Sequence, residues 1–441
     1  MADIYFRVDG NSIISTGHIM RCLSIARACR KIMNDKGLPG EIHFLVSDGE
    51  SEALLRERMS GNGNPTAENK SRNFSATRDV EETFEIINLN CRYDCLDEDI
   101  AGYGIVETLG EKPWIFVDSY FAGPEYFESM RRFFRVAYLD DFREFPCDVE
   151  LLINYDTDED CDFYKCAAMK LLGPEYTPLR EQFEGTSYKV KKEVTDVLLS
   201  TGGTDPYGVA EKILERMGVA GCEVGAGCKV AAGGEVVAEC ETGAGCEVGA
   251  ECEVAAGCEV GAECEVAAGC EVGAECEVAS GWNYHVVTSR ANRRFDALIT
   301  LAEKNPRIFV HEGVTDMASL MASCDIAVSA GGVTLCELAA VGVPTISFSM
   351  ADNQMTAVEN FAKRDLIPYC GDVRGEADEC EDVCGEADEC EDEAFEEAID
   401  KVVSKLQEIA KDYSLRQEKS MMLRAYIDGC GAAKIAEKLL L

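Results

Sequence analysis

Residues 325–354 constrain the fold of this chain more than any other stretch, because they read as a complete strand, turn, helix and strand. Ile326 to Val328 form a short apolar run typical of a buried strand, and the small residues from Ser329 to Gly332 predict a turn. Apolar residues at helical spacing follow from Thr334 to Val341, and Val343 to Phe348 predict a second strand. Units of this kind connect parallel strands of one sheet.

The turn at Ser329 to Gly332 predicts an anion-binding site at the start of the following helix. Backbone amides there point outward, the helix dipole adds roughly half a positive charge, and glycine lets a phosphate approach closely. Glu337 lies about one turn inside this helix, where its carboxylate could accept hydrogen bonds from a ribose diol. Asn353 and Gln354 follow the second strand, which favours a ligand site over the alternative, an ordinary crossover whose small residues serve tight packing.

Strand-like and helix-like segments alternate in both halves of the chain, a pattern typical of parallel sheets covered on both faces. The first half has strand-like segments at 4–8, 42–46, 114–117, 136–139 and 151–153, and helix-like segments at 17–33 and about 124–132. A second series begins near residue 196, with strands at 197–199, 284–287, 308–310 and 326–328 and a helix at 209–217. We therefore expect an α/β protein of two doubly wound, Rossmann-like domains, residues 1–190 and 191–441, with ligands beyond the carboxyl ends of the strands.

An inserted segment at 218–280 repeats every six residues. Cysteine recurs at this period from Cys222 to Cys276, missing only at Gly234, and an aliphatic residue, mostly valine, keeps register with it. The unit resembles the hexapeptide repeat of left-handed parallel β-helices, and about ten repeats would give roughly three coils. A poorly ordered low-complexity tract is the alternative. The segment has no histidine to act as an acyltransferase base, and its cysteine spacing matches no zinc site.

A second repeat, at 372–393, has a ten-residue period and predicts a solvated acidic loop. The formal charge of −40 is concentrated in the two repeats, which carry −12 and −11. An acidic surface argues against DNA, RNA and anionic membranes as partners, because phosphate contacts need clustered Lys and Arg. No apolar run reaches 18 residues and no signal-peptide pattern opens the chain, so we expect no membrane span and a cytoplasmic location. The sequence points to no cofactor and no metal, and it leaves the oligomeric state open.

A second chemical signal lies near the N-terminus, where Arg7-Val8-Asp9-Gly10-Asn11 is followed by Thr16-Gly17-His18-Ile19-Met20-Arg21. His18 would lie in the first turn of a helix, where the helix dipole disfavours the imidazolium ion. A neutral imidazole facing a cleft can accept a proton, and Asp9 at the strand end could orient the ring. A solvated histidine at a helix N-terminus is the alternative.

These motifs form part of an ordered set that resembles a known family. The set also contains Val-Asp-Ser-Tyr at 117–120, Leu-Asp-Asp at 139–141, Leu-Ile-Asn-Tyr at 152–155, the segment 172–180, Gly-Gly-Thr-Asp-Pro at 202–206 and the block 329–354. It is similar to the UDP-2,4-diacetamido-2,4,6-trideoxy-β-L-altropyranose hydrolases of the pseudaminic acid pathway and to their spore-coat polysaccharide relatives. The resemblance covers most of the chain outside the two repeats. The block 329–354 is shared with the MurG-like UDP-GlcNAc glycosyltransferases, and the Gly-His-x-Met-Arg element separates the two groups.

The resemblance implies a GT-B fold and cleavage of the sugar–UDP bond by water at the anomeric carbon, without a metal or cofactor. It makes His18 the general base with Asp9 as its neighbour, and it assigns the pyrophosphate to Ser329, Gly331 and Gly332. Ribose would lie on Glu337, and Asn353 and Gln354 would close on the nucleotide or sugar. Further substrate contacts are expected from Gly17, Arg21, Asp118, Tyr120, Asn154, Gly203, Thr204 and Thr334. The chain departs from the family pattern at Ser15, where a glycine is expected, and near 286–289, where the usual glycine after the valines is absent.

Two other functions fit the same sequence. A glycosyltransferase on this scaffold would replace water by a sugar acceptor, and it predicts a hydrophobic or basic acceptor face in the N-terminal domain, which the sequence does not display clearly. A non-catalytic scaffold, in which the hexapeptide repeat is the working part, predicts that His18→Ala leaves function intact.

Overall fold

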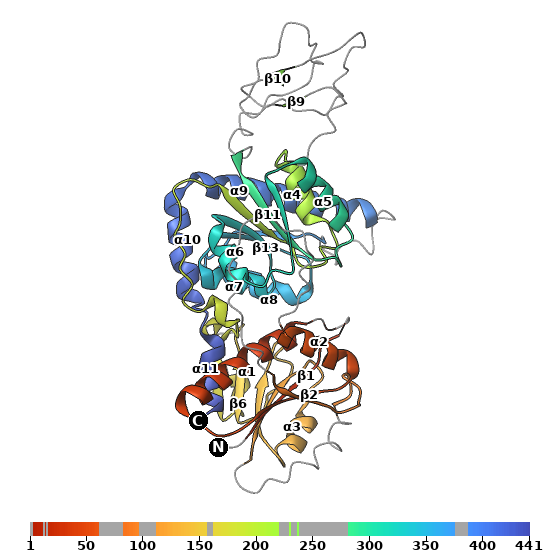
Figure 1. Ribbon diagram of the computed structural model, residues 1–441, viewed down its shortest axis with the longest axis vertical. Coiled ribbons are helices and arrows are strands. Elements are labelled where there is room, and N and C mark those ends of the chain that lie inside the picture. Colours follow the sequence, from red (N-terminus) through yellow and green to blue (C-terminus); the bar gives the residue numbers. More distant parts are fainter. Residues whose placement is uncertain are drawn as a thin grey trace.

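The computed structural model describes residues 3–11, 14, 16–60, 83–96, 112–156, 162–219, 229–230, 236–237, 281–374 and 387–441. These residues form two sheets, one in each half of the chain, with helices on both sides of each sheet (Figure 1). The predicted pair of Rossmann-like domains is therefore confirmed. The boundary between residues 190 and 191 stays a prediction.

The N-terminal sheet has seven strands in the order β3-β2-β1-β4-β5-β6-β7, all of them parallel. The order reverses between β1 and β4, and such a switch point opens a crevice beyond the carboxyl ends of the strands. The strands are β1 (Ile4–Val8), β2 (Ile42–Val46), β3 (Glu85–Asn88), β4 (Trp114–Asp118), β5 (Arg135–Leu139), β6 (Leu151–Asn154) and β7 (Met169–Leu172). The helices are α1 (Gly17–Lys36), α2 (Gly49–Ser60) and α3 (Pro124–Met130).

The C-terminal sheet has six parallel strands in the corresponding order, β12-β11-β8-β13-β14-β15, with its own reversal between β8 and β13. The strands are β8 (Asp196–Ser200), β11 (Asn283–Thr288), β12 (Ile308–Glu312), β13 (Ile326–Ala330), β14 (Thr345–Ser349) and β15 (Tyr369–Asp372). The helices between them are α4 (Val209–Arg216), α5 (Phe295–Lys304), α6 (Met317–Ser323), α7 (Val333–Val341) and α8 (Asp352–Lys363).

The central strands are buried on both faces. Every residue of β4, β13 and β14 is buried, which explains why these strands read in the sequence as short continuous apolar runs. In the N-terminal domain, apolar side chains of β1, β2 and α1 form one core cluster, and α7 and α8 contribute to another in the C-terminal domain. The carboxyl ends of the strands are thereby fixed in place, and the candidate site residues lie there.

Three helices complete the chain after β15, namely α9 (Ala387–Lys411), α10 (Tyr413–Tyr426) and α11 (Gly431–Leu439). Figure 1 shows α10 descending beside the C-terminal domain and α11 lying next to α1 in the N-terminal domain. Ile435, Ala436 and Leu439 of α11 belong to the same core cluster as β1 and α1. The end of the chain therefore ties the two domains together.

Little of the hexapeptide repeat at 218–280 lies within the described residues. Two short strands there, β9 (Lys229–Val230) and β10 (Val236–Val237), pair antiparallel, and the predicted β-helix otherwise falls outside the described residues. In the acidic repeat at 372–393, residues 375–386 also fall outside them, but α9 begins at Ala387. The expectation of a loop throughout this repeat is therefore wrong for its last residues.

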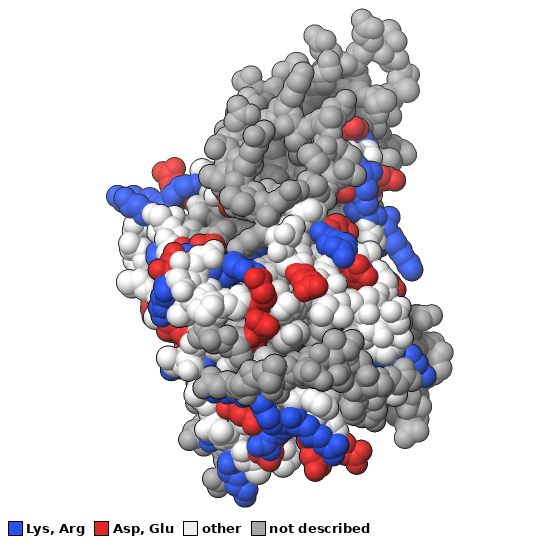
Figure 2. Space-filling view, turned by 60° about the horizontal axis from the view of Figure 1, so that its bottom comes forward, with Lys and Arg blue, Asp and Glu red and all other residues white. Residues whose placement is uncertain are grey.

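On the face shown in Figure 2, acidic and basic side chains are interspersed, with no single continuous acidic surface. This distribution agrees with the concentration of negative charge in the two repeats. Over the described part of the chain, none of the helices combines the length and the apolar character needed to cross a membrane.

Candidate active site

Helix α1 carries His18 to the switch point of the N-terminal sheet. The helix begins at Gly17, shortly after the end of β1, so His18 lies in its first turn as expected. The imidazole is buried, and its Nδ1 lies 2.5 Å from Oδ1 of Asp118, the last residue of β4. Because β1 and β4 are adjacent, with Val8 paired to Asp118, the carboxylate is held next to the start of α1. An imidazole that donates from Nδ1 to a carboxylate keeps its lone pair on Nε2, where it can accept a proton.

Arg21, one turn further along α1, holds Asp118 in its ionised form. The guanidinium donates from Nε and Nη2 to the two oxygens of Asp118, both at 2.6 Å, and from Nη2 to Oδ2 of Asp141 at 2.7 Å. Its Nη1 also donates to the hydroxyl of Tyr155 at 2.7 Å. Burial raises the pKa of Asp118, but Arg21 and His18 outweigh burial and lower that pKa well below its ordinary value. The result is a charged carboxylate beside a histidine, an arrangement that stabilises an imidazolium when one forms.

Asp9 does not orient His18, contrary to our expectation. Its carboxylate accepts from Nη1 of Arg7 at 2.6 Å, and from the amide and hydroxyl of Ser47 at 2.7 and 2.8 Å. These hydrogen bonds join the ends of β1 and β2, and they engage both oxygens of the Asp9 carboxylate. Asp118, which we expected to contact substrate, takes the place beside the ring instead.

The other candidate residues of the N-terminal domain differ in their access to solvent. Tyr120 is 38% exposed, and its ring meets that of His18 edge-on at 4.3 Å between centroids. Gly17 is exposed at the start of α1. Asn154 is buried, and its side chain donates to the hydroxyl of Tyr164 at 3.0 Å, so this amide group is engaged within the protein. Ser15, the departure from the family pattern, lies outside the described residues.

In the C-terminal domain, the three residues that we expected to receive the pyrophosphate make hydrogen bonds within the protein. The hydroxyl of Ser329 is buried and donates to the carbonyl of Ala330. The amide of Gly331 donates to the carbonyl of Phe348 at 3.1 Å, and that of Gly332 to Ala330 at 2.9 Å. These three groups are engaged within the protein and are not free to receive a pyrophosphate in this conformation.

The amides of Val333 and Thr334 are the open donors of this turn. Neither makes a hydrogen bond within the described residues, and they lie at the first two positions of α7, whose N-cap residue is Gly332. Val333 is 53% exposed. Unpaired amides at a helix N-terminus are the kind of donor that an anion can accept, and the role of Thr334 in substrate binding stays a prediction.

Gly331 is required for packing, because a Cβ atom at this position would lie 2.3 Å from Cγ1 of Val358 in α8. We expect Gly331→Ala to lower the free energy of unfolding by about 1–3 kcal/mol, since α8 would have to move. Gly332→Ala is a matched control, because a Cβ there would meet no atom within 4 Å. Urea denaturation of both variants tests this expectation, and equal stability of the two would contradict it.

Glu337 is buried in α7, where Oε1 accepts from Nη2 of Arg180 at 2.7 Å. Burial raises the pKa of Glu337, and Arg180 acts in the opposite direction. Arg180 lies in the segment that leads from the N-terminal to the C-terminal domain, so this ion pair fastens α7 to that segment. The carboxylate has a second oxygen for a ribose hydroxyl, and the role of Glu337 stays a prediction.

The remaining C-terminal candidates are less directly placed. The carboxamide of Gln354 accepts from the amide of Met350 at 2.9 Å and so fixes the loop before α8. Asn353 lies in the first turn of α8, and its side chain falls outside the description. Gly203 and Thr204 are exposed in the turn after β8, where the carbonyl of Gly203 accepts from the hydroxyl of Ser289 at 2.7 Å.

The structure adds residues that we did not select from the sequence. Asp141 and Tyr155 follow the ends of β5 and β6 and complete the shell around Arg21. Asp156 comes next, and its carbonyl accepts from Nδ2 of Asn360 in α8 at 2.7 Å, which is a direct contact between the domains. The available signal was their position just after β5 and β6, two strands on the same side of the switch point as β4.

Asp156 should make stability depend on pH. Burial and the neighbouring Asp141 raise its pKa from 3.8 to about 7, while Arg21 acts in the opposite direction. At pH 5 the carboxyl is therefore protonated in the folded chain and ionised in the unfolded chain, so stability falls as the pH rises from about 4 to about 7 and levels off above that value. We expect Asp156→Asn to remove about 2 kcal/mol of the stability loss between pH 5 and pH 8. Urea denaturation at both values measures this, with the exposed Glu125→Gln as control; the same pH dependence in wild type and Asp156→Asn would refute the assignment.

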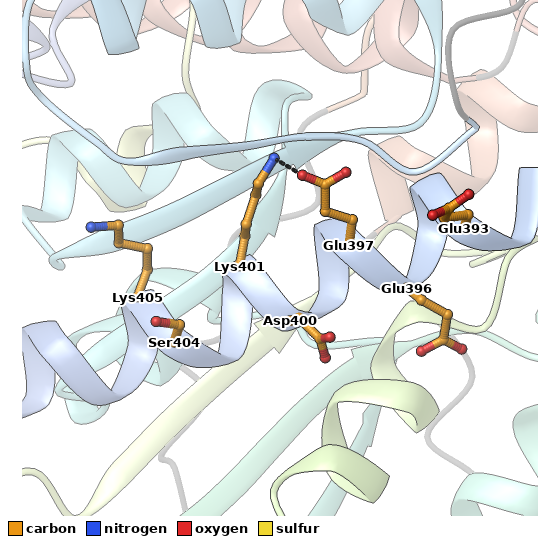
Figure 3. A pocket seen from close by; sticks show the side chains of 7 residues that line it. All are labelled: Glu393, Glu396, Glu397, Asp400, Lys401, Ser404 and Lys405. Carbon is orange, nitrogen blue, oxygen red and sulfur yellow. Dashed lines mark ion pairs between the residues drawn. The ribbon is translucent and has the colours of Figure 1, made fainter. Parts of the chain in front are cut away.

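Two hollows in the described part of the chain lie elsewhere. The first, about 530 Å³, is lined by Glu393, Glu396, Glu397, Asp400, Lys401, Ser404 and Lys405, all on α9 (Figure 3). Because one helix supplies every lining residue, and Lys401 is paired with Glu397 at 2.8 Å, nothing there converges on a ligand. The second, about 350 Å³, lies between Tyr207, Arg294 and Arg374. We therefore keep the candidate site at His18.

Comparison with known proteins agrees with this fold. No family model matches the chain. An 80-residue stretch is 34% identical to the spore coat polysaccharide biosynthesis protein SpsG of Bacillus subtilis (strain 168), and this match covers 18% of the chain and only 24% of SpsG.

Among solved structures, the spinosyn rhamnosyltransferase SpnG complexed with thymidine diphosphate has a TM-score of 0.52 at 10% identity over the whole of both chains. The glycotransferase of kitacinnamycin has a TM-score of 0.52 at 12% identity, also over the whole of both chains. Likeness at this level of identity establishes the fold, which is the GT-B glycosyltransferase fold.

The prediction of a UDP-sugar hydrolase is wrong in the light of these structures. Both of these similar structures are of glycosyltransferases, enzymes that move a sugar to an acceptor. The hydrolase family and the pseudaminic acid pathway therefore have no support beyond the sequence motifs. The glycosyltransferase alternative has the better support.

Proposed function

We propose that this protein transfers a sugar from a UDP-linked amino sugar to a hydroxyl group of an acceptor. The observation that carries the proposal is the His18–Asp118 pair at the switch point of one GT-B domain, with the open amides of α7 in the other. The partial match to SpsG favours an acceptor in polysaccharide biosynthesis. In this proposal residues 1–190 supply the base and residues 191–441 bind the nucleotide.

The residues suggest how the transfer proceeds. Nε2 of His18 accepts the proton of the acceptor hydroxyl, and Asp118 stabilises the resulting imidazolium. The acceptor oxygen attacks the anomeric carbon as the bond from that carbon to the UDP oxygen breaks, and UDP leaves with the electron pair. The amides of Val333 and Thr334 and the dipole of α7 stabilise the negative charge that develops on the leaving phosphate. The proton on His18 then passes to solvent.

Incubation of the full chain with UDP-N-acetylglucosamine tests the proposal. UDP formation should depend on an added acceptor, for which a panel of methyl glycosides serves, and it should fall about 10²- to 10⁴-fold in His18→Ala. Formation of UDP at the same rate without any acceptor would overturn the assignment of transfer. Unchanged UDP formation by His18→Ala would remove His18 as the base, and no binding of nucleotide at all would favour the scaffold alternative.

The α7 amides can be tested separately by Val333→Pro. Proline is well tolerated at the first position of a helix, and Gly332 before it has an extended backbone (φ −90°, ψ −164°), so the variant removes one open donor without breaking α7. Loss of one charge-assisted hydrogen bond should weaken UDP binding about tenfold. Val333→Ala keeps the amide and is the matched control. Isothermal titration measures the affinity of both variants for UDP. Equal affinities would show that the Val333 amide does not bind UDP.

A further inference from the structure

Exposed aromatic side chains gather beside His18. Among the described residues, Tyr120, Phe121 and Phe142 are exposed by 38%, 41% and 51%, although large apolar side chains normally avoid solvent. They follow the carboxyl ends of the neighbouring strands β4 and β5. Exposed aromatic groups at the mouth of a site mark a binding surface. This surface is the hydrophobic face of the N-terminal domain that the transferase alternative requires.

The rings of Tyr120 and Phe142 form a chain of ring contacts that starts at the imidazole of His18. The ring of Tyr120 lies 4.3 Å from His18 and 4.6 Å from Phe142, measured between centroids. Burial and the nearby carboxylate of Asp141 raise the pKa of the Tyr120 hydroxyl to about 12, so this hydroxyl stays protonated at neutral pH. Phe121 packs instead on Tyr93, at 5.6 Å. The surface formed by Tyr120 and Phe142 therefore extends outward from the proposed base.

We propose that Tyr120 and Phe142 form the acceptor subsite and that its occupant is an uncharged pyranose ring. This inference rests on the proposed transfer reaction, which places the acceptor hydroxyl within hydrogen-bonding distance of Nε2 of His18. A sugar seated on the two rings would have a hydroxyl at its edge next to the imidazole.

The chemistry of the surface favours a sugar over a lipid or an anion. The C–H face of a pyranose packs on aromatic rings, while its hydroxyls need polar partners at the edge, and Asp141 and the hydroxyl of Tyr120 are such partners. An aliphatic chain would instead need a continuous aliphatic surface, whereas the exposed side chains here are aromatic. An anionic acceptor would approach the carboxylates of Asp118 and Asp141, whose shared cation Arg21 is already engaged by both.

Saturation-transfer NMR on the full chain tests the subsite without requiring turnover. The probe is methyl β-N-acetylglucosaminide, and octanol is the aliphatic competitor. In the wild type we expect saturation of the ring C–H protons of the sugar. Binding of the sugar should weaken about tenfold in Phe142→Ala and clearly weaken in Phe142→Leu. It should be retained in Phe142→Tyr, which keeps the aromatic ring. Met169→Ala is the control, since Met169 is a similarly exposed residue (37%) at the opposite end of the same sheet.

Each outcome is decisive for one of the two proposals. Saturation of octanol but not of the sugar, or sugar binding unaffected by both Phe142→Ala and Phe142→Leu, overturns the pyranose subsite. Titration with UDP separates the inference from the proposed function. If UDP binds and the sugar does not, only the pyranose subsite is refuted. If UDP does not bind, the proposed transfer reaction is refuted, and the acceptor subsite that rests on it is refuted as well.

Discussion

Replacing Asp118 by asparagine is expected to lower kcat for sugar transfer about 10³- to 10⁴-fold while leaving the affinity for UDP nearly unchanged. The carboxylate lies 2.5 Å from Nδ1 of His18 and so keeps the ring proton on that nitrogen. A carboxamide can present its NH₂ group to Nδ1, which moves the proton to Nε2 and blocks the base. It also removes the negative charge that stabilises the imidazolium. Steady-state kinetics and UDP titration measure the two quantities separately.

Asp9→Asn is the matched comparison for this prediction. Asp9 is also buried at the end of a strand adjacent to β4, but its carboxylate is bonded to Arg7 and Ser47. Its loss should lower stability and leave kcat within about threefold, since removing a partner of a buried charge costs folding free energy. A large drop in kcat for Asp9→Asn with little change for Asp118→Asn would show that the structure misassigns the partner of His18.

Much of the fold was predictable because parallel strands buried on both faces leave a clear pattern. The strands that begin at Ile326 and Leu151, β13 and β6, could be predicted from their apolar residues alone. Strand β3, whose residues are only partly buried or exposed, and β15, which is largely half-buried, lack that signal and were not expected. Helix α11 could not be assigned to the N-terminal domain from sequence, because its apolar face fits any core. Its position depends on Gly431, where a Cβ would lie 2.1 Å from the carbonyl oxygen of Thr177.

The candidate site was predictable as a region and less so in its contacts. His18 and the start of α7 were identified because turns at the carboxyl ends of strands must converge. The choice between Asp9 and Asp118 depends on which strand end the imidazole meets, a tertiary detail that spacing does not encode. Likewise, the glycines of the turn led us to expect an anion site. The sequence does not reveal that the amides of Gly331 and Gly332 donate to the carbonyls of Phe348 and Ala330.

Arg21→Met is expected to lower the free energy of unfolding by about 3–5 kcal/mol at pH 7, the largest stability effect in the site. Methionine fills a similar volume but leaves Asp118 and Asp141 without their shared cation, and Asp118 is 1% exposed. Urea denaturation measures the effect. Arg21→Met combined with Asp141→Asn should recover part of the loss, because one uncompensated charge is removed.

The pH dependence of this effect distinguishes lost ion pairing from lost packing. Arg21 and His18 lower the pKa of Asp118 below its ordinary 3.8 in the folded chain, so the stabilisation of this group is present above about pH 4 and is lost as the pH falls further. The difference between wild type and Arg21→Met should therefore be complete at pH 7 and shrink at pH 3, where Asp118 becomes protonated in the variant. A packing defect would cost the same free energy at both values. A constant difference, or one below about 1 kcal/mol at pH 7, would mean that Arg21 fills space beside His18 without holding the carboxylate that orients it.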